Sequence, residues 1–390
     1  MKREIIIFVI NIIFILPVTV SCDKNEIVTP PDLPPPDEVK YNWDSIAAIT
    51  YNDLISVYWN DSYNRFYSDN AFNTKFNYWW QAHGMDVIVD NLLRTEKIND
   101  ERLIELRNGI YKRNGDKLEN SYYDDMEWLA LALLRAYNAT GTESFLIDAK
   151  YLWHDIQTGW NDTHGGGIAW NKHKTYYKNM PANGPAAILA LRLYKLNNNN
   201  DDFLFGEKIF NWFDEVLVEN VTGKIYDGIG RNGDDEIDKD WQWTYNYGTY
   251  IGACIELYEI TNDKKYIQKA VTSANYALNN FTNPTTNVLK SQGHSDAGLF
   301  NGIFIRYLTK LTTLESLAPA IQDKFIMYII DNAKSLWEDG KVKDPNGHIL
   351  FNEDWAKAPS IEGSVELSVQ LSGQMLMESI AYLQLNSYIK

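Results

Sequence analysis

Twelve segments of the chain repeat apolar residues with the 3.6-residue period of an α-helix, and this pattern constrains the fold more than any other feature. Polar stretches that contain Gly or Pro separate the segments, as expected where helices begin and end. Alternating patterns typical of strands are scarce. The chain is therefore predicted to be all-α, with helices near residues 43–59, 76–96, 99–113, 124–139, 143–159, 183–197, 201–219, 244–261, 263–281, 296–313, 317–338 and 363–386.

Apolar and charged helices alternate in this series. The even-numbered helices are the more apolar and contain small residues, as in 248–255, whereas the odd-numbered helices carry more charge, as in 264–270. A helix that is apolar nearly all round is buried on most sides, and a charged face borders solvent. Six inner and six outer helices predict an (α/α)6 toroid. Such a ring shares its core among helix pairs, which suits a domain that is long for a single compact core.

The first 40 residues differ from the rest of the chain. A basic start is followed by an apolar run that is short for a membrane span and ends in small residues before Cys22. This ending resembles a bacterial lipobox, so residues 1–21 are predicted to be a lipoprotein signal peptide and Cys22 the lipidated residue. An ordinary secretory signal is the alternative.

Residues 22–40 are rich in Pro and contain few apolar side chains, so they are expected to form a disordered tether. No similar linker interrupts residues 41–390, which are therefore predicted to be one catalytic domain. We expect the protein to be anchored by lipid to the bacterial cell envelope, at the outer membrane, with no other membrane contact. Whether it faces the periplasm or the exterior stays open.

Composition excludes several classes of partner and cofactor. A formal net charge of −16 at pH 7 argues against nucleic acid and anionic substrates, whereas 13 Trp, 25 Tyr and 15 Phe residues suit stacking on neutral sugars.

If Cys22 is lipidated, Cys254 has no partner for a disulfide bond. The six histidines lack zinc-site spacing. The acidic stretch 227–238 lacks the closing Glu of an EF-hand loop, so it is interpreted as solvated, with calcium as the alternative. No metal or cofactor is predicted.

Long connections that lead into the predicted inner helices are rich in Gly, aromatic and amide residues. In a toroid these connections converge on one mouth, and long loops on a helical scaffold commonly carry function. Hydrogen-bonding groups beside aromatic rings are the combination that a sugar subsite needs. The converging stretches are residues 77–83, 122–125, 178–184, 241–248, 292–296 and 361–364.

Two adjacent carboxylates, Asp124 and Asp125, begin the most apolar of these helices. Asp124 three residues before Glu127 fits a capping box, so a structural role at the helix N-terminus is one interpretation. A glycosidase pair is the other. Adjacent Cα atoms lie about 3.8 Å apart, so the two carboxyls can reach the ~5–5.5 Å separation of a retaining enzyme more easily than the larger gap of an inverting one. The convergence of the loops on this point favours catalysis.

An ordered set of motifs resembles glycoside hydrolase family 76 over residues 42–385. The motifs are Tyr123-Asp124-Asp125 before an apolar helix, the Gly-rich stretch 165–170, Lys178-Asn179 followed by Asn183-Gly184, and the stretches 243–248 and 300–304. The resemblance implies an (α/α)6 barrel and a retaining, endo-acting α-1,6-mannanase. It further implies Asp124 as the nucleophile, Asp125 as the general acid/base, and α-mannan or manno-oligosaccharides as the substrate. A monomer is expected.

Several residues near the converging loops are predicted to contact substrate: Trp79, His83, Tyr123, Trp128, Trp170, Lys178, Asn183, Trp243, Tyr245 and Asn246. A structural role is the alternative for His83 and for about half of the tryptophans, because Trp is usually mostly buried. Two other functions stay open. One is a lipid-anchored glycan-binding protein without catalysis, and the other is an enzyme acting on uronic sugars, for which Lys178 and Arg231 are the few basic residues available.

Overall fold

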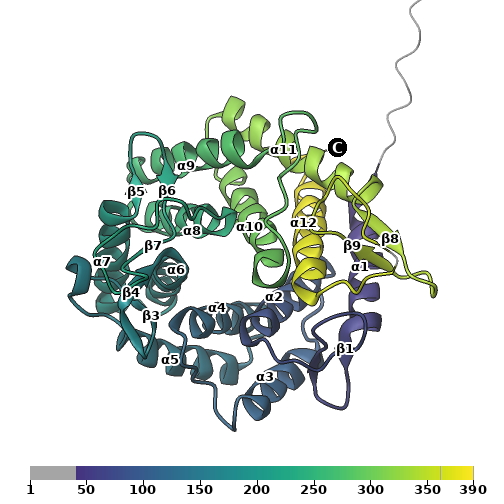
Figure 1. Ribbon diagram of the computed structural model, residues 1–390, viewed down its shortest axis with the longest axis horizontal. Coiled ribbons are helices and arrows are strands. Elements are labelled where there is room, and N and C mark those ends of the chain that lie inside the picture. Colours follow the sequence, from purple (N-terminus) through teal and green to yellow (C-terminus); the bar gives the residue numbers. More distant parts are fainter. Residues whose placement is uncertain (1–40, 361, 390) are drawn as a thin grey trace, which may run out of the picture. The chain divides into compact units, whose positions relative to one another are not determined.

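The helices form a closed double ring (Figure 1). A computed structural model describes residues 41–360 and 362–389. In these ranges twelve α-helices alternate between an inner and an outer ring. The inner helices are α2 (Tyr78–Arg94), α4 (Tyr123–Thr140), α6 (Met180–Asn197), α8 (Thr244–Thr261), α10 (Phe300–Thr312) and α12 (Leu367–Leu385). The outer helices are α1 (Trp43–Tyr58), α3 (Glu101–Arg113), α5 (Glu143–Gln157), α7 (Asn200–Val216), α9 (Lys265–Phe281) and α11 (Pro319–Glu338).

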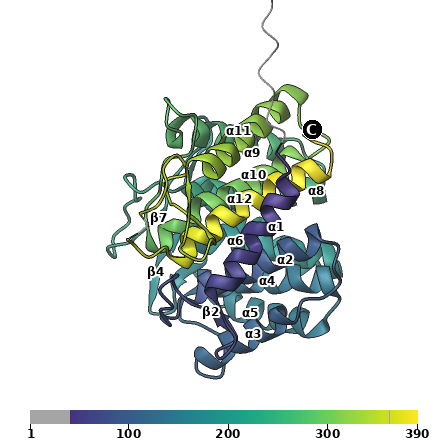
Figure 2. The ribbon, with the colours of Figure 1, turned by 90° about the vertical axis from the view of Figure 1, so that its right-hand side faces the viewer.

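Contacts between successive inner helices close the ring. α2 packs on α4, and the contacts continue in order through α6, α8, α10 and α12 back to α2. Each of α3, α5, α7, α9 and α11 packs on the inner helix that precedes it, and α1 packs on α12. Figure 2 shows this last pair side by side, so the first and last helices of the domain complete the ring. The predicted (α/α)6 toroid is confirmed.

The division into inner and outer helices follows from their side chains. Every residue of α8 from Thr244 to Leu257 is buried, whereas α9 buries a single stripe. Glycines let α8 lie close to α10. A Cβ atom added at Gly248 would lie 3.0 Å from the Cα atom of Phe304, and one at Gly252 would lie 2.5 Å from the ring of Tyr307. Small residues on an inner helix therefore set the distance between ring members.

Short strands occupy the connections that lead from an outer helix to the next inner helix. In the described chain they form four small antiparallel sheets. One of these sheets has the strand order β3-β4-β7, and its strand β4 runs directly into α6. The strands are β1 (Trp59–Asn60), β2 (Arg65–Phe66), β3 (Ala169–Asn171), β4 (Lys174–Asn179), β5 (Val218–Glu219), β6 (Lys224–Ile225), β7 (Gly228–Ile229), β8 (Lys341–Lys343) and β9 (Ile349–Phe351).

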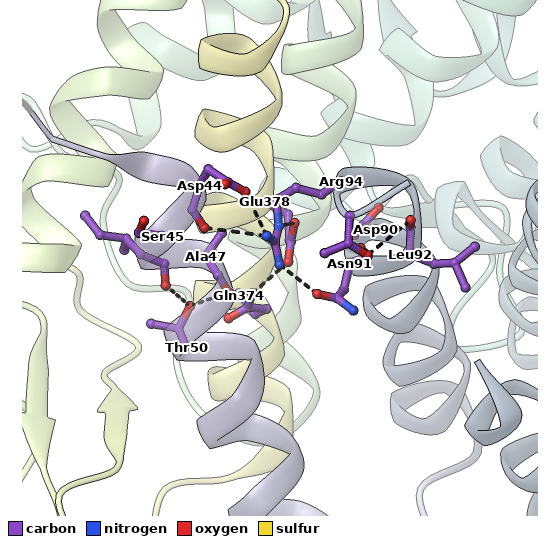
Figure 3. A network of polar contacts seen from close by, with 12 residues as sticks. Asp44, Ser45, Ala47, Thr50, Asp90, Asn91, Leu92, Arg94, Gln374 and Glu378 are labelled. Carbon is purple, nitrogen blue, oxygen red and sulfur yellow. Dashed lines mark hydrogen bonds and ion pairs between the residues drawn. The ribbon is translucent and has the colours of Figure 1, made fainter. Parts of the chain in front are cut away.

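Ion pairs join the inner helices near their C-terminal ends. Arg94 of α2 pairs with Glu378 of α12 at 2.8 Å and with Asp44 of α1 at 2.9 Å, and it also donates to Asn91 (Figure 3). Asp90 pairs in the same region with arginines of α4 and α10. A cavity of about 590 Å³ lies among these side chains. We call this end of the ring the base and the opposite end, where the inner helices begin, the mouth.

The predicted signal peptide, Cys22 and the tether lie outside the described residues, so they and the lipid anchor stay predictions. Among the helices that the structure describes, none is both long enough and apolar enough to cross a membrane.

Candidate active site

A cleft of about 970 Å³ opens at the mouth of the ring, between the first turns of the inner helices and the connections that lead into them. These connections and first turns contribute the seven acidic, imidazole and basic side chains of the lining: Asp124, Asp125, Lys174, Asp227, Arg231, His294 and Asp296. The cleft is lined by Phe76, Asn77, Tyr78, Trp79, Asn114, Asn120, Tyr122, Asp124, Asp125, Trp128, Trp170, Lys174, Tyr177, Asn179, Asp227, Arg231, Asn232, Trp241, Trp243, Tyr245, His294, Ser295, Asp296, Ala297 and Phe300.

The aspartate pair lies inside the first turn of α4. Tyr122 is the N-cap and makes no side-chain capping bond, so Asp124 and Asp125 are the second and third residues of the helix. This position differs from the capping box considered for Asp124 with Glu127. The partial positive charge at a helix N-terminus stabilises carboxylates there. Both side chains line the cleft, where a substrate can reach them.

The two carboxyls have different hydrogen-bond partners. Asp124 accepts from the indole nitrogen of Trp170 at 3.0 Å and from the backbone N–H of Asp125 at 3.0 Å. Asp125 accepts from the side-chain amide of Asn120 at 2.7 Å. Two donors favour the ionised form of Asp124, and a single donor does less for Asp125. The surroundings of the pair are therefore asymmetric.

Burial and the charges of nearby carboxylates raise both carboxyl pKa values. Burial raises the pKa of Asp124 to about 7, although its two donors oppose the shift. Burial raises the pKa of Asp125 well above its usual value, and the negative charges of Asp124 and Asp296 raise it further. Two close carboxyls with unequal surroundings lose their protons one after the other. Asp125 is therefore the better proton donor and Asp124 the better carboxylate.

Glu127 lies one turn further along α4 and is completely buried. Neither of its carboxyl oxygens has a hydrogen-bond partner in the described part of the chain. Burial first, and then the charge of Asp124, raises the pKa of Glu127 well above its usual value. Glu127 is therefore a neutral buried acid and takes no part in capping the helix.

Aromatic rings from four inner helices form one side of the cleft. Trp79 of α2 contacts Trp128 of α4 and Phe300 of α10, with ring centroids 6.4 and 6.3 Å apart. Tyr245 of α8 stacks on Phe300 at 3.8 Å, and Trp243 lies against the same ring at 5.6 Å. Such flat apolar faces suit the C–H faces of sugar rings. Trp79, Trp128, Trp170, Trp243 and Tyr245 all line the cleft, in agreement with their predicted place.

His83 lies beneath this aromatic layer instead of in the cleft. Its ring contacts Trp79 at 5.4 Å and Trp128 at 4.8 Å, and neither ring nitrogen has a hydrogen-bond partner among the described residues. Burial lowers the pKa of His83 to about 3, so the ring is neutral. His83 supports two cleft tryptophans from behind, because it points toward the base cavity.

Two further predicted contacts are structural. Lys178 is completely buried, and its ammonium group donates to the backbone carbonyls of Asn161 and Gly167. Asn183, also completely buried, donates to the backbone oxygen of Ile168 and accepts from its N–H. Both side chains fix the Gly-rich connection against the start of α6, so neither is available to substrate.

Tyr123 and Asn246 are also absent from the cleft lining. The Tyr123 hydroxyl lies 3.3 Å from the hydroxyl of Thr158, on the side of α4 that faces the outer helix α5. Asn246 is completely buried and donates to Asp227 at 3.0 Å. Asn246 therefore orients a cleft residue without reaching the cleft itself.

Asn120, Asp227, Arg231 and Asp296 are among the polar residues of the cleft that were not predicted as substrate contacts. Asp227 accepts from the Tyr177 hydroxyl at 3.0 Å and from Arg231 at 2.7 Å. The Arg231 guanidinium lies 3.5 Å from the ring centre of Trp241. The stretch that contains Asp227 and Arg231 was interpreted as a solvated acidic loop with some part near the cleft, and its first residues do line the cleft. The described residues contain no group of three or more His, Cys, Asp or Glu side chains able to hold a metal ion.

The profile of glycosyl hydrolase family 76 matches residues 42–388, which is nearly the whole described domain. This chain belongs to glycoside hydrolase family 76. The predicted family is thus confirmed, and the cleft is that of a glycosidase. The alternative of a binding protein outside the glycosidases loses its support.

Relatives of this family 76 enzyme include a mannan endo-1,6-α-mannosidase and an α-1,6-mannanase. The mannan endo-1,6-α-mannosidase DFG5 of Candida albicans is 26% identical over 314 residues, which covers 72% of this chain and 67% of the relative. The α-1,6-mannanase GH76A of Salegentibacter sp. HEL1_6 has a similar structure, with a TM-score of 0.82 and 38% identity over 87% of this chain and 99% of the neighbour. An inactive variant of that neighbour, with two consecutive aspartates replaced, was solved with α-1,6-mannotetrose.

A third similar structure is that of the Lin0763 protein of Listeria innocua. It has a TM-score of 0.80 and 36% identity, and the match covers 88% of this chain and 98% of that protein. The family 76 enzyme therefore shares its whole helical domain with proteins of two distinct bacteria.

Proposed function

We propose that this family 76 enzyme is an endo-acting α-1,6-mannanase that hydrolyses the backbone of fungal or yeast-type α-mannan and retains the anomeric configuration. The observation that carries the proposal is a pair of adjacent, unequally stabilised carboxyls, Asp124 and Asp125, in an aromatic cleft. The neighbour that is inactive without two consecutive aspartates, and that was solved with an α-1,6-linked oligosaccharide, supports this assignment.

The spacing of the two aspartates supports retention. Side chains on adjacent residues start from Cα atoms about 3.8 Å apart, so their carboxyls are close enough for a retaining mechanism. An inverting mechanism needs a gap of ~6.5–9.5 Å that holds the attacking water. Asp124 and Asp125 would have to point directly away from each other to leave such a gap, yet both line the same cleft.

In the first step, a carboxylate oxygen of Asp124 attacks C1 of the sugar and the glycosidic C1–O bond breaks. Asp125 gives its proton to the departing oxygen, so the leaving chain ends in a hydroxyl and a glycosyl-Asp124 ester remains. In the second step, Asp125 takes a proton from water, whose oxygen attacks C1 and releases Asp124. Each aspartate returns to its starting protonation state.

The size and walls of the cleft support endo action. Its volume, about 970 Å³, is at the upper end of the range for small-molecule pockets, so it has room for more than one sugar ring. Trp79, Trp170 and Trp243 line the same cleft as the aspartate pair, which suits the binding of several consecutive sugar rings.

Digestion of unbranched α-1,6-mannan tests the proposal. The wild-type enzyme is expected to release a ladder of oligosaccharides early in the reaction. Asp124→Asn and Asp125→Asn are expected to lower kcat by roughly 10³-fold or more, because each change removes a group required in the transition state. Circular dichroism of both variants checks that the fold is intact.

Three outcomes would contradict the proposal. Release of mannose alone from the first minutes would show exo action. Full activity in both variants would show that the aspartate pair is structural. Binding of manno-oligosaccharides without any cleavage by the wild-type enzyme would favour a glycan-binding role for the cleft.

A further inference from the structure

A third carboxylate, Asp296, lies in the cleft together with the catalytic pair. It belongs to the short 3-10 helix Ser295–Leu299, which runs directly into α10. One oxygen, Oδ1, accepts hydrogen bonds from the indole nitrogens of Trp79 at 2.8 Å and Trp80 at 2.9 Å. Two consecutive tryptophans of α2 are thus held by one carboxylate from the opposite part of the sequence.

These two hydrogen bonds fix the orientation of the Trp79 ring in the wall of the cleft. The Trp79 ring is half-buried and forms part of the cleft wall, between Trp128 and Phe300. Trp80 is 2% exposed and belongs to the core, so its indole nitrogen is a fixed reference point for the Asp296 carboxylate. Hydrogen bonds to an ionised acceptor are stronger than those between neutral groups, so Asp296 orients Trp79 most firmly when it is charged.

Asp296 also contributes an electrostatic effect. Its charge raises the pKa of both Asp124 and Asp125, after the larger effect of burial. The other charged or titratable groups that face the pair across the cleft are Lys174 of β4, Asp227 and Arg231 beside β7, and His294 next to Asp296. Glu127 lies beneath the pair on α4. Asp296 is an acidic group outside α4 whose charge raises the pKa of both members of the pair.

We propose that Asp296 is a positioning residue, which holds Trp79 as a sugar platform and presents a fixed negative charge to the aspartate pair. The charge keeps the proton on Asp125 until the leaving oxygen takes it. This inference rests on the proposed function, because it assigns roles to the same cleft. It adds a third acidic residue to the pair that the sequence pattern identifies.

Two substitutions separate the roles. Asp296→Asn keeps an oxygen that can accept from both indoles but removes the charge, whereas Asp296→Ala removes both. In Asp296→Asn, both limbs of the pH profile of kcat/KM are expected to move to lower pH, by on the order of 0.5–1 unit, because a like charge has been removed from both carboxyls. Above the optimum this shift lowers the rate roughly three- to tenfold, with KM nearly unchanged.

In Asp296→Ala, KM and the Kd for manno-oligosaccharide are expected to rise by a further factor of roughly ten, because Trp79 loses a charge-assisted hydrogen bond. Asp331→Asn is the matched control. Asp331 also accepts a side-chain amide hydrogen bond, from Asn287 at 2.7 Å, but lies on the outer helix α11. Its pH profile and KM are expected to equal those of the wild type.

An unshifted pH profile in Asp296→Asn, together with an unchanged KM in Asp296→Ala, would overturn the proposal, even if both variants melt at a lower temperature. A wild-type enzyme that does not cleave mannan would instead contradict the proposed function. In that case calorimetric titration of the Asn and Ala variants with α-1,6-mannotetrose still tests the platform, and equal affinities would overturn it.

Discussion

At the scale of single residues, Glu127 is the most unusual group near the site. A carboxyl without a partner is costly to bury in its charged form, so Glu127 keeps its proton in the folded state. In the unfolded chain the same group ionises near pH 4.3. Above that pH the unfolded state releases a proton that the folded state retains. The free energy of unfolding therefore falls as pH rises, by about 1.4 kcal/mol per unit.

Glu127→Gln removes this titration while keeping the size of the side chain. The difference measured is the free energy of unfolding of Glu127→Gln minus that of the wild type. Between pH 5 and 7, this difference is expected to increase by about 1 kcal/mol with each pH unit. Urea denaturation at several pH values measures the difference. Glu143→Gln, at an exposed position in the first turn of α5, is the control and should follow the wild type at every pH. A constant difference between Glu127→Gln and wild type would show that Glu127 is ionised in the folded state.

Residue chemistry explains which site residues the sequence could predict. The Asp124-Asp125 pair combines an unusual spacing with a helix start, and large aromatic residues near helix starts are visible in any sequence. Whether a polar side chain is buried cannot be read from the sequence in the same way. Lys178 and Asn183 have the polar side chains of a sugar subsite, but the backbone groups that satisfy them come from residues 161–168, and only the folded connection brings these together. Asp296 lies in the stretch 292–296 that was predicted to converge on the mouth, but it was given no role because its partners lie more than 200 residues away.

At the scale of helices, the ends of elements differ most from the prediction. All twelve predicted helices are present, and most bounds agree within a few residues. α6 begins at Met180, before the predicted start, because the Asn179 side chain accepts from the N–H of Ala182 and Pro181 fits the first turn. The predicted helix at 296–313 begins instead as the 3-10 turn that carries Asp296. This turn places a carboxylate over the tryptophans of α2.

The ion pairs at the base stabilise the ring of inner helices. Asp90 of α2 pairs with Arg135 of α4 and Arg306 of α10, at 2.6 Å each. Burial alone would raise the pKa of Asp90, but the two arginines lower it to about 2. The unfolded value is about 3.9. The stabilisation is therefore complete above pH 4 and is lost as the pH falls toward 2.

Asp90→Asn is expected to lower the free energy of unfolding by about 3–5 kcal/mol at pH 7, because two guanidinium groups lose their shared carboxylate in a largely buried site. The difference in the free energy of unfolding between Asp90→Asn and the wild type should shrink below pH 4, because the Asp90 carboxylate of the wild type is protonated there. Asp116→Asn breaks an exposed pair with Lys112 and is expected to leave the free energy of unfolding nearly unchanged. Guanidinium denaturation measures both. Equal effects of the two substitutions would show that the base network does not join the helices.

At the scale of the whole molecule, the ring separates stability from catalysis. The base carries ion pairs between helices, and the mouth carries the cleft, its aromatic wall and four carboxylates. The alternation of apolar and charged helices predicted the ring, since each inner helix must bury all its faces. The sequence could not show which side chains of the connections turn into the cleft, because short strands such as β4 and β7 place them through long-range pairing.

The central claim is that this ring holds a retaining α-1,6-mannanase site built on Asp124 and Asp125. Proton NMR of unbranched α-1,6-mannan, recorded from the first minutes of digestion, tests it most directly. The mechanism predicts that new reducing ends appear first as the α-anomer and only later equilibrate with the β-anomer. Reducing ends that appear first as the β-anomer would contradict the adjacent-pair mechanism and would require a base further from the scissile bond.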